Sequence, residues 1–353
     1  MRTRGLLLIL STSLALAGCG ESSSSEPTGA PWALPVGATE WDVTAPAWFH
    51  AGTLHVGDES VELGERVDTF VLGRTGAYWM RGDTLMFTSA EGATEEVAEV
   101  GWDNLAVSAD RSVLATVDQS RGPTDRYGTH VMQVAVFDTR TGEQLYRTPD
   151  EEPDDGDDLA DLYGEIMPLL EGVSTEHVFY DDATIDLAVG SVTPTTEDAE
   201  GLPVYEDWAE TLFPDGYRVG LRGNGRERQV ADSRIDRLGI LSPDRSTIFD
   251  TSVWPTPAVV YDAATGRQRE IGAPWRHFTL VGWTDEDTFV GVAERIVAEH
   301  PVNNLRARQV VSCELDSLEC TPVSPVVETD DSEDVEGENA TLLVEGGRPY
   351  GGV

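Results

Sequence analysis

The chain has 353 residues and a formal net charge of −40, from 64 acidic and 24 basic residues. A negative surface of this size repels phosphate backbones and anionic lipid headgroups, because the counterion release that drives such binding requires cationic side chains. Nucleic-acid binding is therefore not expected. The length allows one large all-β domain or two ordinary domains.

The first residues have the pattern of an export signal. Arg2 and Arg4 precede the apolar run Leu6 to Leu10, which is too short for a mature transmembrane helix, and Leu16-Ala17-Gly18-Cys19 follows. The last four residues resemble the lipobox of bacterial lipoproteins. That resemblance implies removal of residues 1–18 and diacylation of Cys19, and two acyl chains anchor stably where one is marginal. We expect a lipid-anchored protein on the extracytoplasmic side of the cell membrane; an ordinary secretory signal with a chance cysteine is the alternative.

Residues 19–38 follow the predicted cleavage site and are rich in serine, proline and glycine. Such a composition predicts a flexible tether that holds the folded part away from the membrane. The folded domain is expected to cover residues 39–327.

Within this domain, short apolar runs alternate with turn residues, which predicts antiparallel hairpins. Residues 47–56 resemble residues 77–87, and each unit contains aromatic residues and a glycine-containing reversal. A second pattern, an apolar strand, an acidic turn and another apolar strand, occurs three times, each followed by a further hairpin: 105–117 with 134–148, 239–251 with 258–271, and 280–292 with 310–323. Units of four short strands every 40 to 50 residues are typical of β-propellers.

The residues of the second repeat support the same fold. Ser242-Pro243-Asp244-Arg245 and Tyr261-Asp262, followed two residues later by Thr265-Gly266, are similar to signatures of TolB-like and WD-like propeller repeats. The resemblance implies an all-β protein of four-stranded antiparallel blades. Unit centres near residues 50, 80, 110–145, 180, 220, 240–270 and 280–320 fit seven blades, and six or eight stay open.

An acidic insertion interrupts the repeats near residues 150–172, and its apolar spacing predicts a short helix. Several of its aspartates could supply oxygen ligands to calcium: Asp154, Asp155, Asp157, Asp158 and Asp161. Because the spacing departs from that of an EF-hand loop, a solvated acidic loop is the expected state.

Two other segments carry predictions. Cys313 and Cys320 are the only cysteines besides Cys19, and an oxidising compartment predicts a disulfide between them. The tail 328–353 is acidic and then glycine-rich, so it is predicted to be disordered.

No catalytic, phosphate-binding or cofactor motif is present. The six histidines lack metal-ligand spacing and are expected to be structural: His50, His55, His130, His177, His277 and His300. Asp244 is expected to cap backbone amides of a β-turn. Among the tryptophans, Trp79, Trp102 and Trp283 are predicted to pack between blades, whereas Trp208 is the best candidate for an exposed one.

The sequence therefore favours a monomeric, membrane-anchored propeller that binds an unknown protein or small molecule on one rim. An extracellular propeller hydrolase or lyase with its site at the central channel is the alternative, and a purely structural envelope protein is the third possibility. Clustered histidine, arginine and carboxylate side chains without structural partners at the channel mouth would favour an enzyme.

Overall fold

The computed structural model describes residues 32–42, 44–64, 66–100, 104–108, 110–153, 158–165, 170–180, 183–194, 217–221, 237–242, 244, 246–250, 256–262, 267–285, 287–296, 305–328 and 342–346. These residues form six antiparallel sheets and one helix. No helix among them is long and apolar enough to span a bilayer.

The first three sheets have four strands each. In order across each sheet they are β26 (Leu343–Val344), β1 (Ala47–His50), β2 (Thr53–Val56) and β3 (Glu59–Glu62); β4 (Thr69–Gly73), β5 (Gly76–Arg81), β6 (Thr84–Ser89) and β7 (Thr94–Glu99); and β8 (Ala106–Val107), β9 (Val113–Asp118), β10 (Gln133–Asp138) and β11 (Gln144–Arg147).

The remaining three sheets have four or five strands. They contain β12 (Leu170–Val173), β13 (His177–Tyr180), β14 (Ala183–Asp186) and β15 (Val192–Pro194); β16 (Tyr217–Leu221), β17 (Arg237–Leu241), β18 (Thr247–Asp250), β19 (Val259–Asp262) and β20 (Gln268–Glu270); and β21 (His277–Trp283), β22 (Thr288–Ile296), β23 (Leu305–Glu314) and β24 (Cys320–Pro322), with β25 (Val327–Glu328) paired to β23.

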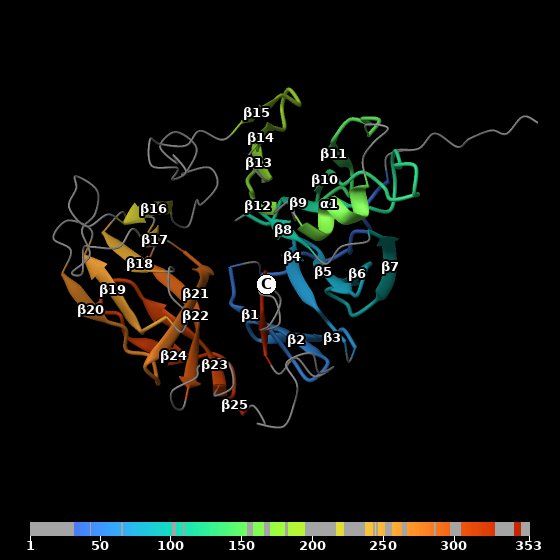
Figure 1. The fold of residues 1–353 in the computed structure, drawn as a ribbon. Helices are drawn as coiled ribbons and strands as arrows, with labels where there is room; N and C mark the ends of the chain where they lie inside the picture. The colour runs from blue at the N-terminus through green and yellow to red at the C-terminus, as the bar shows by residue number, and fades with distance from the viewer. Residues whose placement is uncertain are drawn as a thin grey trace, which may run out of the picture.

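The sheets follow one another in chain order around a common centre (Figure 1), and this arrangement is a β-propeller. The all-β, propeller prediction is confirmed. The preferred count of seven blades is not confirmed, because the described residues form six sheets. The predicted unit near residue 220 supplies β16, which pairs with β17 and adds a fifth strand to the fifth sheet.

The end of the chain closes the ring. Strand β26 pairs with β1, where Val344 lies opposite Trp48 and Leu343 opposite Phe49. The prediction of a disordered tail is therefore wrong at residues 342–346, where Leu342, Leu343 and Val344 are buried. An apolar triplet that can complete an open sheet edge outweighs the polar composition around it. Glu328 is likewise in a strand, β25, and the rest of the tail lies outside the described residues.

The start of the described chain also departs from expectation. Leu34 is buried between the second and third sheets, and its amide donates to the carbonyl of Gly142 at 2.8 Å. Trp32 meets Phe137 edge-on with ring centroids 4.6 Å apart, and Tyr78 Oη donates to the carbonyl of Pro35. The tether prediction is thus wrong for residues 32–35, because Trp32 and Leu34 pack between the two sheets and Pro35 is bonded to Tyr78.

Large side chains fill the spaces between neighbouring sheets, so the middle strands are buried on both faces. Trp79 packs with Phe49 and Phe70 between the first and second sheets. Trp283 packs against Phe249 between the fifth and sixth, with ring centroids 5.4 Å apart. The predicted packing role is confirmed for both tryptophans, whereas Trp102 and Trp208 lie outside the described residues.

Candidate functional site

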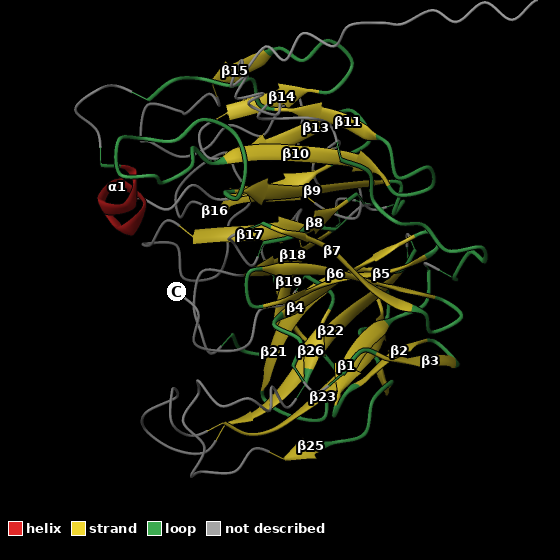
Figure 2. Ribbon diagram, turned by 90° about the vertical axis from the view of Figure 1, so that its right-hand side faces the viewer, coloured by secondary structure: helices red, strands yellow, loops and turns green. Residues whose placement is uncertain are grey.

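The connections on the two sides of the ring differ in length. Since successive strands alternate in direction, the turns β8–β9 and β10–β11 lie on one side, and the connections β9–β10 and β11–β12 lie on the other. The first pair are tight turns. The second pair span residues 119–132 and 148–169 and include α1 (Leu159–Glu165), which lies beyond the strand ends (Figure 2). We call these the turn side and the loop side.

On the turn side, one turn design recurs. In the third sheet, Asp110 Oδ1 accepts hydrogen bonds from the Ser112 amide and from the hydroxyls of Ser108 and Ser112. In the fifth sheet, Asp244 Oδ1 accepts from the Ser246 amide and the Ser242 hydroxyl. Burial raises the pKa of each carboxyl, but these donors outweigh it and hold the pKa below its ordinary value. The capping role predicted for Asp244 is confirmed.

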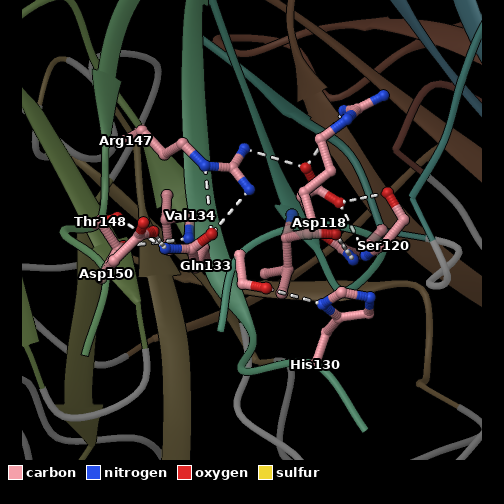
Figure 3. A network of polar contacts seen from close by, with 12 residues as sticks. Asp118, Ser120, His130, Gln133, Val134, Arg147, Thr148 and Asp150 are labelled. Carbon is pink, nitrogen blue, oxygen red and sulfur yellow. Dashed lines mark hydrogen bonds and ion pairs between the residues drawn. The ribbon is translucent and has the colours of Figure 1, made fainter. Parts of the chain in front are cut away.

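On the loop side, a buried ionic network holds the base of the β9–β10 connection (Figure 3). Asp118 ends β9, is fully buried, and accepts hydrogen bonds from Arg147 Nη1 at 2.9 Å and Arg121 Nη1 at 3.2 Å. Its other oxygen accepts from the amide and hydroxyl of Ser120 at 2.8 and 2.7 Å. Arg147 also donates through Nε and Nη2 to Gln133 Oε1, so one guanidinium on β11 joins β9 and β10 as well.

The network extends into the second loop-side connection. Gln133 Nε2 donates to the carbonyl of Thr148 and to Asp150 Oδ1, both at 2.9 Å. His130 Nδ1 lies 3.0 Å from the carbonyl of Gly122. Gly122 is close to Gln133, because a Cβ added at this glycine would lie 2.4 Å from Gln133 Oε1. A buried charge is tolerated only where it is paired and hydrogen-bonded. These contacts therefore hold the residues at which the two connections leave β9 and β11.

Asp125 joins the β9–β10 connection to α1. Its Oδ1 accepts from the amides of Tyr127 and Thr129, and its Oδ2 accepts from the amide of Leu159, each at 2.9 Å. Burial raises the pKa of Asp125, but the amide donors, that of Leu159 first, outweigh it and hold the pKa below its ordinary value. The carboxylate thus satisfies amides of both segments.

Helix α1 confirms the predicted short helix. Asp158 caps it, because its Oδ1 accepts from the amide of Asp161 at 3.3 Å. Tyr163 Oη accepts from the amide of Met132 at 3.0 Å, which ties the helix to the start of β10. Burial of the ring raises the pKa of Tyr163.

Of the five aspartates considered for calcium, the structure describes two. Asp154, Asp155 and Asp157 lie outside the described residues. Asp158 caps α1, and Asp161 is exposed on the helix. Within the described part of the chain, no group of three or more histidine, cysteine, aspartate or glutamate residues could hold a metal ion.

Charged side chains near the centre of the turn side have structural partners. Arg111 Nη2 donates to Glu345 Oε2 at 2.8 Å, and Glu345 Oε1 accepts from the Leu72 amide. Arg74 lies 3.6 Å from Asp110. The contacts of Glu345 join the end of the chain to the second and third sheets.

The disulfide is confirmed: Cys313 on β23 and Cys320 on β24 are bonded cross-strand partners. Cys19 and His300 lie outside the described residues. The buried network of Asp118, Gln133 and Arg147 was missed, since its members are scattered along hairpins. The only sequence signal was their position as charged or amide residues at the ends of apolar strands.

These features define the class of the protein: a β-propeller with tight, aspartate-capped turns on one side and longer acidic connections with a short helix on the other. The fold rests on the sheet order and the closing strand described above.

Comparison with known proteins adds little to this class. No protein-family model and no curated protein matches the sequence. Among solved structures, a TolB protein from Agrobacterium tumefaciens is 12% identical over 85% of this chain and 91% of that one, with a TM-score of 0.39. TolB from Acinetobacter baumannii is 9% identical over 82% of this chain and 65% of that one, with a TM-score of 0.39. An acylaminoacyl peptidase from Pyrococcus horikoshii is 12% identical over 77% and 47%, with a TM-score of 0.36. Similarities this low support no conclusion about activity or partners.

Proposed function

We propose that this protein is a lipid-anchored, extracytoplasmic β-propeller that serves as a binding module, with its partner engaging the loop side. The observation that carries the binding role is the construction of that side. A buried ionic network and the Asp125 carboxylate tie the described residues of two long connections to the third sheet and to each other, whereas the ring is closed elsewhere, by β26 and β1. Loops fixed by a rigid scaffold are the usual location of binding residues in such folds.

The anchoring part of the proposal is supported by the sequence Leu16-Ala17-Gly18-Cys19 after a charged and apolar leader. Replacing Cys19 by serine should move the protein from the membrane fraction to the soluble fraction, because the acyl chains supply the attachment. Fractionation followed by immunoblotting measures this. Unchanged partitioning of the Cys19→Ser variant would refute lipid anchoring.

The binding role is tested in intact cells with a photo-crosslinking amino acid at position 127 on the loop side. A matched probe at Val189, which lies in the β14–β15 turn on the turn side, serves as the control. We expect one discrete adduct from position 127 and none from position 189. Equal adducts from both positions, or none from either, would contradict a loop-side binding module.

The enzyme alternative is less well supported. The described charged residues at the turn-side centre, Arg111 and Glu345 among them, are paired with each other and with backbone amides. No observation in the described residues favours a specific reaction, so we do not develop this alternative.

A further inference from the structure

We propose that the loop side binds a basic, amphipathic segment of a partner protein. The inference rests on the proposed binding function and adds the surface and the chemistry of its partner. The surface is the acidic lobe, which we define as residues 119–132, 148–153 and 158–165. It contains two exposed apolar side chains, on segments that the Asp125 carboxylate joins, and five exposed carboxylates.

Two large apolar side chains of the lobe are exposed. Tyr127 is 58% exposed and Leu162 is 42% exposed, whereas most large apolar side chains of the described residues are buried. The two belong to one rigid unit, because the amides of Tyr127 and Leu159 bind the same Asp125 carboxylate and Leu162 lies one helical turn beyond Leu159. Leu159 itself is buried, so the helix already has an inward apolar contact. Leu162, and the part of the Tyr127 ring that Arg126 does not cover, stay exposed and can make an external contact.

The described residues of the lobe are held by internal contacts. Asp118 and Gln133 bind residues of both connections, Asp125 binds the amide of Leu159, and Tyr163 ties α1 to β10. Binding to a surface that is already ordered avoids the entropy cost of fixing loops and side chains. Tyrosine is also a favourable contact residue, because it presents a large, rigid area with a polar tip.

The charge of the lobe determines which partner fits. Its exposed carboxylates are Asp150, Glu151, Glu152, Asp158 and Asp161. Of its two arginines, Arg121 is paired with buried Asp118. Arg126 is exposed, lies over the Tyr127 ring with its guanidinium carbon 4.6 Å from the centroid, and donates to Tyr127 Oη. Five exposed carboxylates against two arginines leave the described lobe negative, which attracts cationic side chains and repels acidic ones. Arginine or lysine residues interleaved with apolar residues match both features.

Other occupants fit less well. A second copy of this chain would bring a net charge of −40 against another of −40, which repels. A divalent cation needs several converging oxygens, but Asp158 Oδ1 already accepts the Asp161 amide, and Asp125 accepts three amides.

The test measures fluorescence anisotropy of short labelled peptides titrated with the purified protein. One peptide alternates leucine and arginine, a second replaces leucine by serine at the same charge, and a third replaces arginine by glutamate. The leucine–arginine peptide should bind at least about tenfold more tightly than either other peptide, since both contact types are required. Its binding should weaken as salt is added.

Variants locate the contact. The double variant Tyr127→Ser, Leu162→Ser should lose about tenfold or more in affinity for the leucine–arginine peptide. The matched control Val189→Ser, Val192→Ser removes two apolar side chains that are 73% and 55% exposed on β14–β15, and it should change affinity less than about twofold. Urea unfolding of both variants checks that each is folded.

Three results would overturn the inference: equal loss in both double variants, equal binding of the serine–arginine peptide, or displacement of the peptide by calcium with no effect of the Tyr127 and Leu162 substitutions. Self-association that requires Tyr127 and Leu162 would identify a second copy as the occupant instead.

A position-127 cross-link in cells, combined with peptide binding that does not depend on peptide charge, would refute this inference alone. Peptide binding as expected without any cross-link in cells would refute the proposed function.

Discussion

At the scale of single residues, two glycines of the loop side differ in whether a side chain would have room. Gly122 and Gly128 flank the Asp125 cap and have nearly the same left-handed backbone, with φ of +90° and +92°. They differ in their surroundings. A Cβ at Gly122 would lie 2.4 Å from Gln133 Oε1, whereas a Cβ at Gly128 would meet nothing within 4 Å.

This pair yields a matched prediction. Both Gly128→Ala and Gly122→Ala should cost about 1 kcal/mol of unfolding free energy for placing alanine at positive φ. Gly122→Ala should cost about 1–3 kcal/mol more, because it displaces a buried amide that Arg147 requires. Urea unfolding measures the difference. Equal destabilisation by the two substitutions would show that the network around Gln133 does not depend on this contact.

Residue patterns gave part of this site and not the rest. Asp244 was predicted as a turn cap because the donors of such a cap are close in sequence, and Ser242 and Ser246 each lie two residues from it. Asp118 and Arg147 were not predicted, since they are far apart in sequence and meet only when β9, β10 and β11 pair in register. Local chemistry is visible in one sequence, but partners across a sheet depend on a register that the sequence does not display.

At the scale of elements, the first sheet contains a pH-sensitive pair. His55 on β2 stacks on Trp48 on β1, with ring centroids 3.8 Å apart. Burial lowers the pKa of His55, nearby His50 lowers it further, and Glu62 opposes them. The folded protein therefore holds His55 neutral at pH values where the unfolded chain is already protonated.

The sign of the effect follows from that difference. Between the ordinary histidine pKa of about 6.5 and the lower folded value, the unfolded state binds more protons, so stability falls as pH falls. We expect the unfolding free energy to decrease below about pH 6.5, and His55→Gln should reduce the slope in that range. Urea unfolding as a function of pH tests this. A slope unchanged by His55→Gln would assign the pH dependence to other groups.

Element boundaries were harder to predict than element types. The repeated hairpins were predicted from alternation and turns, but the unit near residue 220 was counted as a blade. In the structure its strand β16 extends an existing sheet through β17. A strand shows the same alternation of apolar and polar residues whether it starts a new sheet or joins an existing one. The number of blades therefore depends on which strands pair, and the sequence pattern does not show that.

At the scale of the whole molecule, five residues near the end of the chain connect four sheets. Leu343 and Val344 pair with β1, and the Gly346 amide donates to the carbonyl of Phe70 in the second sheet. Glu345 binds Arg111 of the third sheet, and the carbonyl of Leu342 accepts from Arg308 of the sixth.

Removing one carboxylate from this closure should be costly. In the Arg111–Glu345 pair the side chains are only 19% and 13% exposed, so Glu345→Ala leaves a mostly buried arginine and the Leu72 amide without their acceptor. We expect the free energy of unfolding, measured in urea, to fall by about 2–4 kcal/mol. The control Glu328→Ala breaks a pair with side chains 43% and 64% exposed and should cost at most about 1 kcal/mol. Comparable losses in the two variants would contradict the closing role of Glu345.

The packed segment at residues 32–37 determines where mechanical tension enters the molecule. A pull applied from the N-terminal end does not reach β1 directly, because Leu34 and Trp32 are wedged against the third sheet and Tyr78 of the second holds the carbonyl of Pro35. The load is shared by the second and third sheets, and not by the first sheet, in which β26 pairs with β1. Stretching by a flow or by a moving partner would strain that wedge first and leave the seam between β1 and β26 unloaded until the wedge gave way.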